Sequence, residues 1–122
     1  MDKKYNISTL LDFYGDMLTE RQRTAAELYY NEDLSLSEIA EEIGISRQGV
    51  RAALVKSEEI LIGFESKLGL AQRFYKAKKN VDTLLEYAEK VRVQSEKTGD
   101  ERLGMIARDI IMLTSKIEKD IG

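Results

Sequence analysis

The sequence predicts an all-α protein, and three observations support that fold class. None of the 122 residues is proline, and the composition is dominated by isoleucine together with the helix-favouring residues alanine, leucine, glutamate, lysine and arginine. Apolar residues recur at spacings of three and four along most of the chain, the period of an amphipathic helix. We expect a helix-turn-helix bundle with a long fourth helix over residues 1–69, followed by an antiparallel helical hairpin over residues 70–122.

Apolar spacing and one capping motif predict the first two helices. The first is expected over about residues 6–18, with an inward face of Ile7, Leu10, Leu11, Tyr14, Met17 and Leu18. Residues 19–22, TERQ, form a capping box in which Thr19 and Gln22 bond each other's backbone amides. The second helix then runs to about Tyr30, before the turn-forming residues 31–33, and its inward residues are Ala25, Leu28 and Tyr29.

A short third helix and a long fourth helix follow. The third spans residues 36–43, with Ser35 or Ser37 at its start and Gly44 at its end. The fourth begins after the cap Ser46 and runs to about Lys67, where Gly69 stops it. The predicted inward face of the fourth helix consists of Val50, Ala53 or Leu54, Ser57, Leu61, Phe64 and Leu68.

Two heptad patterns joined by a short turn predict the hairpin. Its first helix carries Phe74, Ala77, Val81, Leu84, Ala88 and Val91. After Gly99 closes that helix and Asp100 caps the next, the second carries Leu103, Ile106, Ile110, Leu113, Ile117 and Ile121. Further apolar residues lie off this line: Met105, Ala107, Ile111 and Met112. One partner helix cannot cover so much apolar surface, so the hairpin packs on the N-terminal half or forms a dimer face.

Residues 39–51, IAEEIGISRQGVR, have the spacing of a helix-turn-helix. Ala40 is small where two helices cross closely, Gly44 permits the turn, and Ile45 fills the core from within it. The remaining apolar contacts between the two helices are expected from Ile39, Ile43 and Val50. A helix-turn-helix places its second helix in the major groove of DNA, so this segment is a candidate for nucleic-acid binding.

The candidate nucleic-acid-binding residues are Ser46, Arg47, Gln48, Arg51 and Lys56. Arginine makes bidentate hydrogen bonds to guanine, and glutamine makes them to adenine. A helix N-terminus and a lysine can each bind a phosphate. The alternative is that Arg47 and Arg51 only form surface ion pairs, with partners among Glu41, Glu42 and Glu58.

Charge distribution opposes this prediction. The formal net charge is −3, and residues 1–62 hold 7 lysines and arginines against 12 aspartates and glutamates, a balance of −5. Phosphate binding usually needs a basic surface, so both interpretations stay open.

A second basic stretch is Arg73, Lys76, Lys78 and Lys79, interleaved with Phe74 and Tyr75. Basic residues beside aromatics bind nucleic-acid phosphates and bases. The alternative is that Phe74 belongs to the heptad line and the lysines are an ordinary solvated face.

Several functions are disfavoured by what the sequence lacks. With no cysteine and no histidine there is no disulfide, thiolate metal site, cysteine nucleophile or Ser-His triad. The acidic residues form no metal or acid-base motif, and the glycines form no phosphate loop. We therefore expect no catalytic residue, metal or cofactor. Without a long apolar run or a signal-peptide core, we expect no membrane insertion and a cytoplasmic location.

Two stretches carry a family resemblance. SLSEIAEEIGISRQGVRAALVKSEEIL (35–61) resembles region 4 of bacterial sigma factors, which reads promoter DNA. DFYGDMLTERQR (12–23) and LYYNEDLSLSEIAEE (28–42), within a match over 10–51 and 57–70, resemble the YlxM family of Gram-positive bacteria. The family commonly has polar and basic residues after the turn, whereas this chain has Gly49, Ala52 and Ala53.

The resemblance implies a small all-helical protein with a sigma-region-4-like helix-turn-helix. In that family the gene lies beside those for the signal recognition particle GTPase and its receptor, which implies a regulatory part in that pathway. The implied partners are DNA or RNA, including signal recognition particle RNA, and the GTPase or its receptor. Independently of the resemblance, the apolar excess at Ile111 and Met112 permits a homodimer. The alternative function is an accessory factor that contacts the GTPase and reads no DNA.

Overall fold

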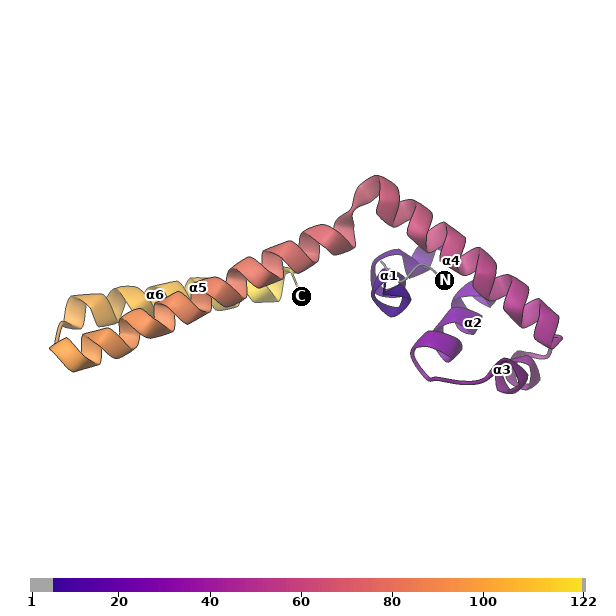
Figure 1. Ribbon diagram of the computed structural model, residues 1–122, viewed down its shortest axis with the longest axis horizontal. Coiled ribbons are helices and arrows are strands. Elements are labelled where there is room, and N and C mark those ends of the chain that lie inside the picture. Colours follow the sequence, from indigo (N-terminus) through magenta and orange to yellow (C-terminus); the bar gives the residue numbers. More distant parts are fainter. Residues whose placement is uncertain (1–5, 122) are drawn as a thin grey trace. The chain divides into compact units, whose positions relative to one another are not determined.

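The computed structural model describes residues 6–121 and is entirely helical within them apart from short turns (Figure 1). This confirms the predicted all-α class, and no strand occurs among those residues. The elements are α1 (Ile7–Tyr14), the short 3-10 helix η1 (Gly15–Met17), α2 (Glu20–Tyr30), α3 (Leu36–Ile43), α4 (Arg47–Leu68), α5 (Leu70–Thr98) and α6 (Glu101–Ile121). None of the described helices is both long and apolar enough to cross a membrane.

The chain divides into two compact units, the first ending at Ala71 and the second beginning at Gln72. In the first unit α1, α2 and α3 all pack against α4, which forms the central helix (Figure 1). The buried core of this unit is made by Ile7, Leu10, Leu11, Tyr14, Leu18, Ala25, Ala26, Ile39, Val50, Leu54, Leu61 and Ala71. Because this core draws on all four helices, the orientation of α4 is fixed from one end to the other.

Side-chain caps set the helix starts in the first unit. The Gln22 amide donates to Thr19 Oγ1 (3.2 Å), and the Thr19 amide donates to Gln22 Oε1 (3.0 Å), which confirms the capping box. Ser35, rather than Ser37, caps α3 in the same way, through Glu38. Each box satisfies two amides that the first helical turn leaves without a backbone acceptor.

The Glu38 cap makes stability depend on pH. The Ser35 amide, and then its hydroxyl, hydrogen-bond the Glu38 carboxylate and lower its pKa. A lowered folded-state pKa means that the carboxylate stabilises the fold above its unfolded pKa, and that this stabilisation is lost as pH falls through the folded pKa. We expect wild type to lose stability relative to Glu38→Gln over that acidic range, measured by urea unfolding at a series of pH values. An unchanged difference between the two proteins would contradict this.

The first helix is shorter than predicted. α1 ends at Tyr14, η1 follows, and Met17, expected to face inward, is 60% exposed. The Thr19 cap requires extended backbone, and Leu18 is already extended (φ −88°, ψ 153°). The chain must therefore leave the α-helix before residue 18, and Gly15, a weak helix former, begins the tighter turn. Asp16 in that turn pairs with Arg23 Nη1 of α2 at 2.5 Å.

Two other residues expected inside also lie outside. Tyr29 is 39% exposed, and its ring packs edge-on against Tyr30 (4.9 Å) while Leu28 and Tyr30 contact the core. The reason is that both Ala25 and Ala26 are fully buried, which rotates the inward face of α2. At the end of α4, Leu68 is exposed and Glu65 is buried instead.

Two glycines within α4 differ in their surroundings. A Cβ at Gly63 would meet nothing within 4 Å, whereas one at Gly49 would lie 3.2 Å from Ser46 Oγ and 3.3 Å from Ile45 Cδ1. Alanine loses less backbone entropy in a helix than glycine. We expect Gly63→Ala to stabilise the protein by about 0.5–1 kcal/mol. Gly49→Ala should stabilise the protein by less than this or destabilise it. Thermal unfolding of both variants measures the two changes in stability. An equal increase in both variants would contradict the crowding at Gly49.

The second unit contains the hairpin, with Gly99 in the left-handed conformation (φ 73°) at its turn. Asp100 Oδ1 accepts from the Arg102 amide (3.0 Å) and the Leu103 amide (3.4 Å), so it caps α6 as predicted. The buried residues of α5 within this unit are Val81, Ala88 and Ser95; those of α6 are Gly104, Ala107 and Thr114.

The predicted contact face of α6 is wrong. Leu103, Ile106, Leu113 and Ile117 are 36–59% exposed, and Leu84 of α5 is also exposed. The helices approach through small residues instead: a Cβ at Gly104 would lie 2.9 Å from Ser95 Oγ. Large side chains would hold the backbones further apart, so Gly104, Ala107 and Thr114 form the close face. The Ile121 side chain lies outside the described residues.

Candidate nucleic-acid interface

The helix-turn-helix consists of α3, a three-residue turn and α4. Gly44 has φ 76°, and its amide and the Ile45 amide both donate to the Ala40 carbonyl oxygen (2.9 and 3.2 Å). Ile39 and Val50 are completely buried, while Ala40, Ile43 and Ile45 pack against the core from partly buried positions. All six residues predicted to build the motif therefore do so.

The N-terminus of α4 is capped by Ser46, whose Oγ accepts from the Gly49 amide (3.0 Å). Ser46 is exposed, and its hydroxyl proton can still be donated to an anion. The first amides of α4, those of Arg47 and Gln48, have no helical acceptor because they open the helix. This helix end is thus suited to a phosphate oxygen.

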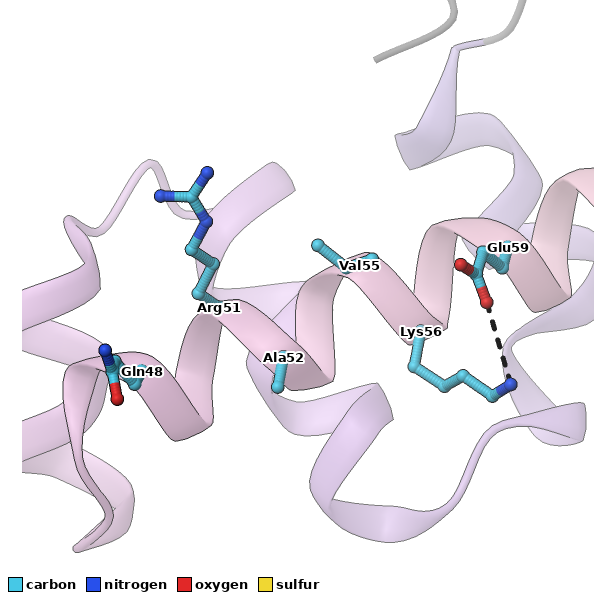
Figure 2. A pocket seen from close by; sticks show the side chains of 6 residues that line it. All are labelled: Gln48, Arg51, Ala52, Val55, Lys56 and Glu59. Carbon is cyan, nitrogen blue, oxygen red and sulfur yellow. Dashed lines mark ion pairs between the residues drawn. The ribbon is translucent and has the colours of Figure 1, made fainter.

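The outer face of α4 carries a shallow hollow of about 460 Å³ (Figure 2). Its lining residues are Gln48, Arg51, Ala52, Val55, Lys56 and Glu59, all on this one helix. Figure 2 shows the Arg51 side chain extending away from α4, whereas the Lys56 side chain bends along the helix toward Glu59. The hollow includes three of the five predicted nucleic-acid-binding residues, and Ser46 and Arg47 precede it at the same helix end.

The charges on this face do not form the surface pairs that were considered as the alternative to nucleic-acid binding. Within residues 6–121, Arg47 and Arg51 take part in no ion pair, so the alternative of surface pairs with Glu41, Glu42 or Glu58 is not what the structure shows. Glu58 instead accepts a hydrogen bond from the Tyr30 hydroxyl. The pair that forms joins Lys56 Nζ to Glu59 Oε2 (3.6 Å), a spacing of one turn that the sequence contained but that was not predicted. Two arginines are therefore available to an anion, and Lys56 is partly neutralised.

The three small residues after the turn have different surroundings. Gly49 is half-buried beside Ser46 and Ile45, where a side chain would crowd the cap. Ala53 packs against the core. Only Ala52 lies on the exposed face, beside Val55. Of the three small residues that depart from the family pattern, only Ala52 therefore replaces a longer side chain on the outer face of α4.

The second basic stretch lies on α5, and Arg73, Lys76, Lys78 and Lys79 are all exposed. Residues two apart on a helix do not share a face, so Lys76 and Lys78 point to different sides. Phe74 is half-buried, and its ring meets that of Tyr75 at 6.1 Å. A nucleic-acid-binding role for these residues stays a prediction. No group of three or more acidic side chains within the described residues could hold a metal ion.

The all-α fold, with α4 as the second helix of the motif and one face of it exposed, defines a helix-turn-helix protein. The chain belongs to the UPF0122 family, described as "Putative helix-turn-helix protein, YlxM / p13 like", whose sequence model matches residues 1–102. This confirms the resemblance to the YlxM family.

Several bacterial relatives carry the name UPF0122 protein. One from Latilactobacillus sakei is 36% identical over 110 residues, which cover 90% of this chain and 93% of the relative. One from Acetivibrio thermocellus is 40% identical over 103 residues, covering 84% and 88% of the two chains. One from Lactiplantibacillus plantarum is 34% identical over 118 residues, covering 97% and 98%.

Proposed function

We propose that this protein binds nucleic acid through the outer face of α4. The observation that carries the proposal is the pair of exposed arginines, Arg47 and Arg51, which have no acidic partner within residues 6–121 and follow the turn of a helix-turn-helix. In this arrangement Arg51 and Gln48 contact base edges, while Ser46, Arg47 and Lys56 contact phosphates. The proposed role is binding and regulation.

The resemblance to the YlxM family extends the proposal to a pathway. The family's genes neighbour those for the signal recognition particle GTPase and its receptor, so the proposed role is regulation of co-translational protein targeting in the cytoplasm. The ligand is then DNA or RNA, with signal recognition particle RNA as one candidate.

Fluorescence anisotropy against genomic DNA fragments and signal recognition particle RNA tests the proposal. We expect binding that weakens as salt rises, because bound phosphates release counterions. The double variant Arg47→Ala, Arg51→Ala should bind at least about tenfold more weakly. A matched control, Arg21→Ala with Lys67→Ala, removes two exposed positive charges away from the hollow and should bind nearly as wild type. Absence of binding at low salt, or equal loss in both double variants, would refute the proposal.

A second candidate function is that of an accessory factor that contacts the signal recognition particle GTPase. Ala52 and Val55 make an apolar centre in the hollow, and Val55 is an exposed large hydrophobic residue. The acidic balance of residues 1–62 also suits a basic protein surface better than a phosphate backbone. A pull-down with the purified GTPase and its receptor separates the two functions, since retention by either protein with no nucleic-acid binding would favour this candidate.

A further inference from the structure

A line of large apolar side chains on α6 is solvent-exposed. We call this line the α6 seam; it consists of Leu103, Ile106, Ile110, Leu113 and Ile117. Ile110 is half-buried, and the others are among the exposed large hydrophobic residues of the chain. The spacings of three and four residues repeat as a strict heptad, with Leu103, Ile110 and Ile117 at position a and the other two at position d.

The hairpin itself buries little apolar surface. Among residues 72–120 the buried hydrophobic residues are Val81, Ala88 and Ala107, and none of them is larger than valine. A small unit with so small a core lacks the hydrophobic stabilisation that two long helices need. An additional surface over the α6 seam would supply this stabilisation, because large apolar side chains gain free energy when they are removed from water.

The charges beside the α6 seam indicate what that surface is. Arg102, Asp109 and Lys116 follow one another every seven residues, at the heptad position that flanks the seam. Within residues 6–121 none of the three takes part in an ion pair. The charges of this stripe therefore run positive, negative, positive along the helix, and they can complement a second stripe of the same sequence.

Pairing two α6 helices antiparallel sets each flanking charge opposite the same heptad position of the other helix. In one register Asp109 meets Asp109 and Arg102 meets Lys116, which places like charges together. A shift by one heptad places Asp109 opposite Lys116, and the two-fold symmetry repeats that attractive pair. The same shift puts Ile110 opposite Leu113 and Ile106 opposite Ile117, so four of the five seam residues stay paired with apolar partners, while Leu103 lies opposite Asp120 near the helix end. A parallel pair would place the charges opposite Ala107 and Thr114, with no attraction gained.

We infer that a second copy of this chain covers the α6 seam, antiparallel, with Asp109 of each copy facing Lys116 of the other. The two hairpins then form a four-helix arrangement, in which short-looped antiparallel helices share one apolar core. This interface lies on α6 and does not involve α4, so it is independent of the proposed nucleic-acid binding.

Sedimentation equilibrium of the full chain tests the dimer. We expect twice the chain mass of 13.9 kDa at tens of micromolar, and a monomer for Ile106→Asp with Leu113→Asp. The matched control is Met105→Asp with Met112→Asp, on the same helix and equally exposed (60% and 58%) but off the α6 seam; it should stay dimeric. Circular dichroism checks that both variants remain helical. A monomeric wild type, or a dimer that survives the seam variant, would overturn the inference.

A charge exchange tests the register and does not depend on the apolar variants. Asp109→Lys alone, and Lys116→Asp alone, each replace two attractive pairs by two repulsive ones and should raise the dimer Kd about tenfold. The double exchange restores opposite charges and should return the Kd to within about threefold of wild type. Arg102→Ala, which faces no charge in this register, should leave the Kd unchanged. A double exchange as weak as the single variants would exclude this register.

Discussion

Replacing Glu65 by leucine is expected to lower the free energy of unfolding by about 1–3 kcal/mol for each buried donor that loses its acceptor. Glu65 is only 7% exposed, and its Oε1 accepts from the Tyr14 hydroxyl (2.7 Å) and from the Ala71 amide (3.0 Å). The Tyr14 hydroxyl oxygen accepts in turn from the Leu70 amide (3.1 Å). Leucine has a similar volume and lacks the oxygen that accepts both hydrogen bonds. Urea unfolding followed by circular dichroism measures the loss of stability.

The reason for so large an effect is that this network caps α5. Leu70 and Ala71 supply its first amides, which have no acceptor within the helix, and the preceding residue is Gly69, which has no side chain. Tyr14 and Glu65 provide the missing acceptors from α1 and α4, and a carboxylate also suits the positive end of a helix dipole.

Two further variants make that prediction specific. Tyr14→Phe leaves one part-buried donor, the Leu70 amide, without its acceptor, whereas Glu65→Leu leaves two buried donors, the Tyr14 hydroxyl and the Ala71 amide. Tyr14→Phe should therefore cost less than Glu65→Leu. Glu59→Leu, at an exposed position of the same helix, should change stability by under about 0.5 kcal/mol. If Glu65→Leu were no more destabilising than Glu59→Leu, the capping role of Glu65 would be refuted.

This network also shows which parts of the fold the sequence could predict. The caps at Thr19, Ser35, Ser46 and Asp100 involve residues two or three apart, so a short motif contains both partners. Tyr14 and Glu65 are 51 positions apart, and no local pattern joins them. From the sequence alone, a glutamate on the inward side of α4 only interrupts the apolar pattern, because its hydrogen-bond donors cannot be identified.

The prediction that the α6 seam contacts α5 was wrong for a related reason. A heptad pattern indicates that a helix has an apolar face, but it does not say which helix covers that face. Gly104 and Ala107 permit a closer approach to α5 than Ile106 does, and close packing decides the contact. The pattern was correct in indicating more apolar surface than the hairpin can bury.

In the candidate interface, too, some features could be predicted from the sequence and others could not. The turn at Gly44 and the face with Gln48 and Arg51 follow from helix spacing, so both could be predicted. The partners of the charges could not, because side-chain pairing depends on rotamers: Lys56 reaches Glu59, while Arg47 and Arg51 pair with none of the glutamates considered. The half-buried position of Gly49 also depends on the bulk of Ile45 in the turn.

Arg51→Ala is expected to weaken nucleic-acid binding by about tenfold to a hundredfold, whereas Glu59→Gln is expected to strengthen it. Arg51 lies in the hollow without an acidic partner in the described chain, so its loss removes an interaction worth about 1–3 kcal/mol. Glu59 holds Lys56 and adds a negative charge to the same face. Glutamine removes that charge and leaves Lys56 available to a phosphate.

The salt dependence of binding separates these effects from unfolding. Removing or adding one bound phosphate changes the slope of log K against log salt by about one, so the slope should become shallower for Arg51→Ala and steeper for Glu59→Gln. Opposite changes from two substitutions on one helix cannot arise from a common loss of folded protein. If Glu59→Gln bound as weakly as Arg51→Ala, the outer face of α4 would not be the phosphate-binding surface, and docking of a protein partner in the hollow would be the better explanation.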